Sequence, residues 1–91
     1  MYQVKPTTKF QRDLKRAEKR GYKIDLLTMV IKKLAAGEVL DEGYNDHQLK
    51  GRYKNCRECH VTPDWLLIYE IVNDTLILYL TRTGTHADLF E

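Results

Sequence analysis

The titratable side chains in the C-terminal half of the chain are of the types that acid–base catalysis uses. The sequence has three histidines, His47, His60 and His86, and Asp64 follows His60 after three residues. Imidazole titrates near neutral pH, so two histidines, or a histidine and a carboxylate, can serve as base and acid in one reaction. These four residues are therefore the first candidates for chemistry.

An arginine and several aromatic residues in the same half suit an RNA substrate. Arg82 offers a fixed charge and a planar fork that match phosphate oxygens and the extra charge of a pentacoordinate phosphorane. Tyr53, Trp65 and Phe90 offer flat rings on which unpaired bases can stack, although Trp65 can equally belong to the core. Such groups suffice to cleave RNA without a metal ion. The base takes the proton of the 2′-OH, that oxygen attacks the adjacent phosphorus, and the acid protonates the leaving 5′-oxygen.

Two cysteines introduce a competing interpretation. Cys56, Cys59 and His60 have the C-x-x-C-H spacing of a haem attachment site, and with further histidines they could ligate zinc. Covalent haem belongs to exported proteins, and residues 1–5 do not resemble a signal peptide. In a strand, Cys56 and Cys59 would point to opposite faces because their separation is odd. We therefore expect reduced thiols, a cytoplasmic location, and no metal or other cofactor.

The first third of the chain predicts a strand followed by a helical hairpin. Residues 2–5 alternate weakly, as a short strand would. Thr7 or Thr8 can start a helix that carries apolar residues at helical spacing and ends at Gly21. A second helix is expected from near Asp25 to Gly37, where glycine makes a good C-cap.

The remainder of the chain predicts a meander of three strands. Residues 38–51 are polar and rich in turn formers, so they indicate a loop. Strands are expected over 53–61, 65–72 and 75–82, with turns at 62–64 and 73–74 and a short tail over 83–91. The expected fold is one α+β domain over residues 1–91, in the order β-α-α-β-β-β. Its two-helix hairpin packs on one face of an antiparallel sheet.

This topology brings candidate residues together. In a meander, the end of the first strand lies beside the start of the second, and the third strand returns to that same edge. His60, Asp64, Arg82 and His86 are therefore expected to converge at one edge of the sheet. No such argument places His47.

The charge of the chain is unevenly distributed. Residues 1–37 hold ten basic and three acidic side chains, a net charge of +7, whereas the rest hold five basic and ten acidic ones, a net charge of −5. A basic half on a small domain indicates a polyanionic partner, although a charge run is often only a solvated helix face. No apolar run approaches the ~20 residues of a membrane span, so no membrane association is expected.

Three segments carry a resemblance to a known family. Residues 46–51 read DHQLKG, residues 59–69 read CHVTPDWLLIY, and residues 82–90 read RTGTHADLF. They resemble the blocks H-x-L-x-G, H-V-x-P-D-W and R-T-G-[TS]-H-x-x-L-F of YafQ-type toxins in the RelE superfamily. The blocks are specific when they occur in this order, and the resemblance extends over essentially the whole chain.

The resemblance implies a ribosome-dependent endoribonuclease that cuts messenger RNA in the ribosomal A site. It also implies a cognate antitoxin that holds the toxin inactive, in a complex that represses its own operator DNA. His86 resembles the principal catalytic histidine of the family, His60 and Asp64 the other acid–base and orienting members, and His47 an assisting one. Phe90 is expected to hold or stack a base.

Two further assignments accompany the resemblance. Arg82 is our candidate for stabilising charge in the transition state. The basic helices agree with a surface that docks on ribosomal RNA, for which the candidates are Lys15, Arg16, Lys19 and Arg20.

Two other functions stay open at this point. A ParE-type relative has the same fold but acts by binding DNA gyrase, and it needs no catalytic histidines. A toxin that has lost its activity would keep only antitoxin binding and operator repression.

Overall fold

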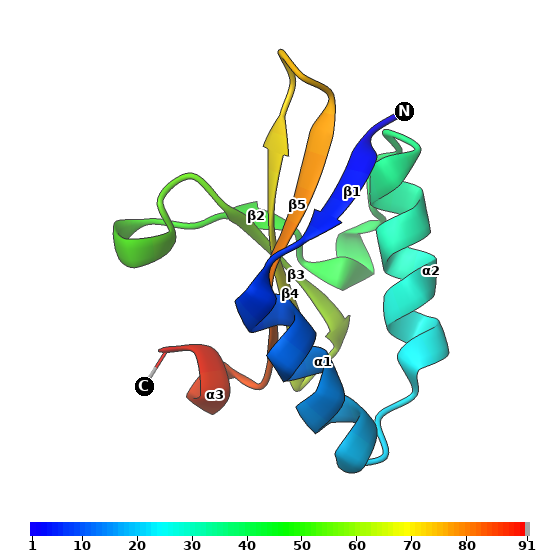
Figure 1. Ribbon diagram of the computed structural model, residues 1–91, viewed down its shortest axis with the longest axis vertical. Coiled ribbons are helices and arrows are strands. Elements are labelled where there is room, and N and C mark those ends of the chain that lie inside the picture. The colour runs from blue at the N-terminus through cyan, green and yellow to red at the C-terminus, as the bar shows by residue number, and fades with distance from the viewer. Residues whose placement is uncertain (91) are drawn as a thin grey trace.

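A two-helix hairpin packs on one face of a five-stranded sheet in the computed structural model, which describes residues 1–90 (Figure 1). The strands and α-helices follow one another as β1 (Gln3–Pro6), α1 (Thr8–Lys19), α2 (Ile24–Ala35), β2 (His47–Gln48), β3 (Arg57–Thr62), β4 (Trp65–Val72), β5 (Ile77–Gly84) and α3 (His86–Phe90). Short 3-10 turns, Glu42–Tyr44 and Gly51–Tyr53, flank β2. The α+β class and the helical hairpin agree with the sequence prediction.

The sheet is mixed, with the strand order β1-β5-β4-β3-β2. Strands β3, β4 and β5 form the predicted antiparallel meander, and β4 has the predicted bounds. The sheet departs from the predicted antiparallel arrangement in its first strand alone, because β1 pairs with β5 in parallel. The hairpin of α1 and α2 carries the chain across the sheet, so the first strand can join the outer edge of the last one in the same direction.

The helix boundaries follow from local capping. The Thr7 hydroxyl accepts a hydrogen bond of 3.1 Å from the Phe10 amide, which satisfies a free N–H at the start of α1. Past the end of that helix, Gly21 has φ +79°, a left-handed conformation that favours glycine. Gly37 plays the same part after α2, with φ +80°. Both turns agree with the sequence prediction.

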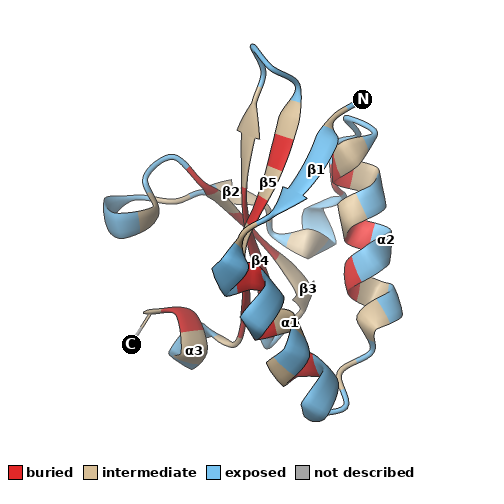
Figure 2. Ribbon diagram, in the orientation of Figure 1, coloured by how far each residue is buried: buried red, intermediate tan, exposed pale blue. Residues whose placement is uncertain are grey.

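The core lies between the helices and one face of the sheet (Figure 2). Phe10 and Ala17 of α1, with Leu27 and Val30 of α2, are buried against the strands. A second, smaller cluster lies on the opposite face, where Leu89 of α3 covers the sheet. The helix α3 was not predicted within the tail, nor β2 within the loop. Both are shorter than the patterns that indicate a helix or strand in a sequence.

The two cysteines lie in different hydrophobic clusters, as the odd spacing predicted. Cys59 belongs to the core beneath the helices, and Cys56 belongs to the cluster on the other face. Burial raises the pKa of the Cys56 thiol and raises the pKa of Cys59 to about 12. Both side chains are therefore protonated at neutral pH. Within residues 1–90, no helix has the length and apolar character needed to cross a membrane.

Candidate functional site

His60, Asp64 and His86 line one hollow of about 500 Å³. The sheet register explains why they meet. His60 of β3 lies opposite Leu66 of β4, and Leu66 lies opposite Gly84, where β5 ends and leads to His86. Asp64 stands in the turn that joins β3 to β4. The predicted convergence at this edge of the sheet therefore holds for these three side chains.

A capping box places His86 at the start of α3. The Thr85 amide donates a hydrogen bond of 2.9 Å to Asp88 Oδ2, and the Asp88 amide donates one of 3.1 Å to Thr85 Oγ1. Gly84 fits this turn because a Cβ there would come within 3.0 Å of the Asp88 side chain. The Arg20 guanidinium beside Asp88 holds the pKa of that carboxyl well below its usual range. The start of α3 is thus determined by both local and long-range contacts.

Phe90 lies against His86 rather than in open solvent. The two rings are stacked, with centroids 4.7 Å apart and 28° between their planes. Tyr53 meets the Phe90 ring edge-on, at 5.6 Å between centroids. The Tyr53 hydroxyl and Arg52 both donate to the Leu89 carbonyl, at 3.3 and 2.9 Å, which ties α3 to the loop before β3. Phe90 therefore supports the His86 ring from one side.

Glu58 links the other two histidines, and the sequence prediction did not include it. Glu58 Oε2 lies 3.2 Å from His47 Nε2 and 3.8 Å from His60 Nε2. The Glu58 side chain is only 7% exposed, and within residues 1–90 its Oε1 atom is buried without a hydrogen-bond partner. A carboxylate so placed is costly to bury unless it is paired. Its alternation with His60 in a strand, two residues apart, is the signal that could have identified it.

His47 is placed by pairing of β2 with β3. Its register partner is Glu58, so the two side chains project from neighbouring strands. His47 Nδ1 donates a hydrogen bond of 2.7 Å to the Asn45 carbonyl, because a carbonyl can only accept. His47 Nε2, on the other side of the ring, then faces the Glu58 carboxylate. His47 does not line the hollow but reaches it through Glu58 and His60.

The structure does not bring the Arg82 guanidinium into the hollow. Arg82 donates hydrogen bonds of 2.6 and 3.0 Å to the buried carboxylate of Asp13 on α1. The Asp13 carboxylate also accepts a bond of 3.1 Å from the Thr83 amide. The expectation that Arg82 would join the convergent side chains was wrong in this respect. Beyond the end of β1, α1 lies directly alongside β5, and this brings the buried acid within reach of Arg82.

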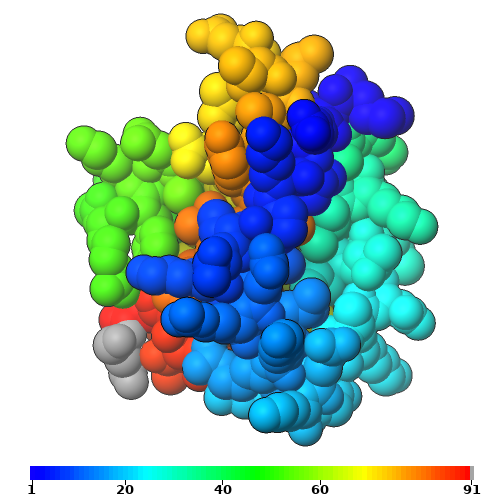
Figure 3. All heavy atoms as spheres, viewed as in Figure 1, coloured from blue at the N-terminus to red at the C-terminus, as the bar shows by residue number. Residues whose placement is uncertain are grey.

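The four candidate docking residues divide into two kinds. Arg20 donates to Asp88 and so ties α1 to α3, whereas Arg16 donates to Asp13 at 3.1 Å within α1. Lys15 and Lys19 are exposed, and in the described part of the chain neither forms an ion pair. In Figure 3 the C-terminal segment, coloured red and orange, lies against the lower part of the blue helix α1. The basic helix therefore combines structural arginines with free lysines.

Trp65 belongs to the core, which is the second of the two interpretations that the sequence left open. Its side chain is buried, and its Nε1 donates a hydrogen bond of 2.8 Å to Thr83 Oγ1. That hydroxyl in turn donates to the Leu66 carbonyl at 2.7 Å. Tyr22, from the turn between the helices, lies against the indole with ring centroids 5.0 Å apart. This pair lies next to the hollow, because Tyr22 lines it as well.

Comparisons with known proteins point to one family. Residues 2–91 match the family model described as the bacterial toxin of type II toxin–antitoxin system, YafQ. The chain is 39% identical over 82 residues to the mRNA interferase toxin YafQ of Escherichia coli strain K12. The aligned region covers 89% of this chain and 87% of that protein. The crystal structure of YafQ from E. coli strain BL21(DE3) is similar over 100% of both chains, with a TM-score of 0.93 and 34% identity. A chain in the crystal structure of the E. coli DinJ–YafQ toxin–antitoxin complex is similar over 99% of this chain and 98% of that one, with a TM-score of 0.89 and 35% identity.

Proposed function

The chain belongs to the YafQ family of bacterial toxins of type II toxin–antitoxin systems, and from this premise we propose that it is an mRNA interferase. It is an endoribonuclease that cuts messenger RNA in the A site of the ribosome, and residues 1–91 act as one toxin domain. The observation that carries this proposal is the convergence of His60, Asp64 and His86 around one hollow, with Glu58 joining His60 to His47.

The reaction uses acid and base groups that the site already holds. One of His60 and His86 removes the proton of a 2′-OH, and that oxygen attacks the adjacent phosphorus. The other histidine protonates the 5′-oxygen as its bond to phosphorus breaks, leaving a 2′,3′-cyclic phosphate and a 5′-hydroxyl. Asp64 lines the same hollow and orients the bound RNA there. The side chains suffice for this reaction without a metal ion or another cofactor.

Glu58 and His47 act through His60 rather than on the substrate. The carboxylate faces both imidazoles, so it orients them and can hold the proton that His60 gives or takes. Phe90 keeps the ring of His86 in place by stacking on it, and its remaining surface is available to an RNA base.

Charge in the transition state comes from the protonated histidine, since the Arg82 guanidinium pairs with Asp13. We therefore assign Arg82 first as a positioning residue that fastens α1 to β5. A direct contact between Arg82 and phosphate stays a prediction, and it requires the ion pair to open.

The partners follow the family. We propose that a cognate antitoxin covers the toxin, as DinJ forms a toxin–antitoxin complex with YafQ in E. coli. The complex binds its operator DNA, and the free toxin acts in the cytoplasm on ribosomes that carry mRNA. Lys15 and Lys19 contribute to docking on ribosomal RNA, because their ammonium groups are exposed.

Primer extension on a translated message tests the proposal. Wild-type protein should cut the message at discrete positions within codons, and this cleavage should require ribosomes. Expression of the protein should also arrest growth. His86→Ala should reduce cleavage by roughly 100-fold or more and relieve the arrest while the protein stays folded. Undiminished toxicity of this variant would exclude the mechanism. Growth arrest without any cut message would instead favour a toxin that acts by binding a protein such as DNA gyrase.

A further inference from the structure

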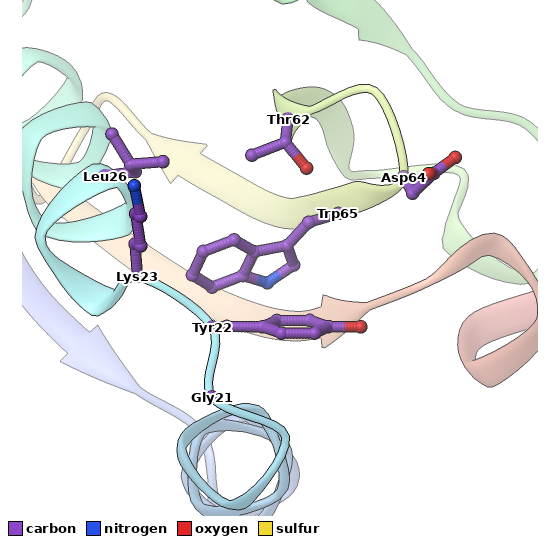
Figure 4. Close-up of a pocket in the computed structure, with 7 residues that line it drawn as sticks. All are labelled: Gly21, Tyr22, Lys23, Leu26, Thr62, Asp64 and Trp65. Atoms are coloured by element: carbon purple, nitrogen blue, oxygen red, sulfur yellow. The ribbon is translucent and has the colours of Figure 1, made fainter.

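A second hollow adjoins the site, and none of the three histidines lines it. It has a volume of about 400 Å³ and shares Tyr22 and Asp64 with the hollow of the histidines (Figure 4). Its other walls come from the helical turn at Lys23 and Leu26 and from Thr62 and Trp65. The two hollows are therefore neighbours that share Tyr22 and Asp64 as lining residues.

The walls are flat and apolar, and the polar groups lie around them. In Figure 4, the rings of Tyr22 and Trp65 lie across from one another, Leu26 and Lys23 stand at one end, and Asp64 stands at the other. Tyr22 is half-buried, which leaves part of its ring open to a ligand. A planar heterocycle with polar edges matches such a lining, because its faces can stack while its edge forms hydrogen bonds.

The polar groups of this hollow are available to a ligand. In the described part of the chain, the side chains of Lys23, Thr62 and Asp64 make no hydrogen bond to another residue. The ammonium of Lys23 can only donate, the carboxylate of Asp64 can only accept, and the hydroxyl of Thr62 can do both. Together they can satisfy the donors and acceptors that alternate along the edge of a nucleobase.

The hollow is held in shape before any ligand arrives. The Tyr22 amide donates a hydrogen bond of 3.0 Å to the Ala17 carbonyl, and the Gly21 amide donates one of 3.0 Å to Glu18, so the turn that carries Tyr22 is closed on the end of α1. The indole of Trp65 is fixed by its bond to Thr83. A preformed pocket costs less conformational entropy on binding than a flexible one.

We propose that this hollow binds one unpaired base of the RNA, next to the nucleotide whose phosphate is cut, and that Tyr22 and Lys23 select that base. The inference rests on the proposed ribonuclease function, since this hollow adjoins the histidine hollow and is thus where a neighbouring nucleotide would lie. Tyr22 stacks on the base, and Lys23, Thr62 and Asp64 contact its edge. Preference for particular codons then arises in this hollow rather than at the histidines.

Trp65 makes the proposal measurable without cleavage, because it is the only tryptophan in the chain. We would titrate the toxin with a 2′-O-methyl RNA trinucleotide, which cannot be cut, and follow the indole fluorescence. The matched probe is the same trinucleotide with one base removed, tested at each position in turn. We expect one abasic position to weaken binding by about tenfold, the effect of removing one base stack.

Substitutions test which side chains bind the base. Tyr22→Leu and Lys23→Met should each weaken binding of the intact trinucleotide, and Tyr22→Leu should remove the difference between intact and abasic probes. Tyr22→Phe keeps the ring and should retain that difference. The matched controls are Tyr44→Leu, which removes a half-buried tyrosine elsewhere, and Lys32→Met, which removes an exposed lysine of α2. Both should bind as the wild type does.

The outcomes separate this inference from the proposed function. Equal binding of intact and abasic probes, or unchanged binding by folded Tyr22→Leu, would overturn the base pocket even if the wild type cuts message. Base-dependent quenching in a protein that cuts no message would support the pocket and contradict the nuclease. Cleavage sites mapped on a translated message should spread over more codons in Tyr22→Leu, and an unchanged set of sites would contradict base selection.

Discussion

Arg20 donates hydrogen bonds of 2.7 and 3.3 Å to the carboxylate of Asp88, across 68 positions of the chain. This pair joins the end of α1 to the first turn of α3, the short helix that begins with His86. A side chain that the sequence indicated for RNA docking thus has a structural part in placing a histidine of the site.

The Arg20–Asp88 pair predicts an effect on cleavage. Arg20→Ala and Asp88→Asn should each lower the single-turnover cleavage rate by about tenfold, because α3 loses its tie and His86 shifts. The two effects should not add in the double variant, since each change breaks the same pair. Lys32→Ala, which removes an exposed cation of α2, serves as the control and should cut normally. Full additivity in the double variant would mean that the two residues act separately.

Asp88 also predicts how stability depends on pH. Its pKa in the folded protein lies below the ordinary value, mainly because of Arg20, so the ionised form favours folding. That contribution is complete above the ordinary carboxyl pKa of about 3.9 and is lost as the pH falls toward the folded-state value. The free energy of unfolding should therefore be larger for the wild type than for Asp88→Asn at neutral pH, and the difference should shrink as the pH falls below about 4. Urea titrations at several pH values measure it, and a constant difference would contradict this assignment.

Glu58 predicts a loss of activity without a loss of stability. Glu58→Gln keeps the shape of the side chain but removes the charge that faces His47 and His60. Cleavage should fall at least about tenfold, and the pH profile of the rate should change, because the histidines lose their shared partner. The melting temperature should not fall, since a buried carboxylate with an unpaired oxygen is costly. Glu70→Gln, on β4, is the matched control; a normal rate and pH profile in Glu58→Gln would leave Glu58 without a role.

The Arg82–Asp13 pair predicts a loss of stability rather than a direct loss of activity. Arg82→Ala should lower the free energy of unfolding by roughly 3 kcal/mol, because it weakens the pairing of a buried carboxylate. Combining it with Asp13→Asn should recover part of that stability. Chemical denaturation of the single and double variants measures both effects. If Arg82→Ala kept its stability but lost cleavage, the guanidinium would act on the phosphate instead.

The free lysines of α1 predict a salt-dependent effect on ribosome binding. Replacing Lys15 and Lys19 by alanine should weaken ribosome binding and make it less dependent on salt. The slope of the logarithm of the binding constant against the logarithm of the salt concentration should become shallower by roughly 1 for each phosphate that the variant no longer neutralises. Cosedimentation with ribosomes at several salt concentrations provides the measurement. Lys5→Ala with Lys32→Ala gives a control of equal charge outside α1. Equal weakening in both pairs would indicate general charge attraction rather than docking through α1.

Much of the fold could be predicted from the sequence because its signals are local. Apolar residues at helical spacing predict α1 and α2, and the apolar run of residues 65–72 predicts β4 with its observed bounds. The meander follows from short turns between strands, and it brings His60, Asp64 and His86 to one edge. The partnership of β1 with β5 could not be predicted in this way, because parallel pairing joins residues far apart in the sequence.

By itself, the sequence determined the residue types of the site, their order in three blocks, and the family to which the chain belongs. Only the tertiary structure decided which charges act together. It placed Glu58 between His47 and His60, and it paired Arg82 with Asp13 and Arg20 with Asp88. The physical reason is that a charged side chain takes the partner that packing brings within reach. That partner can come from any part of the chain, so spacing along the sequence does not reveal it.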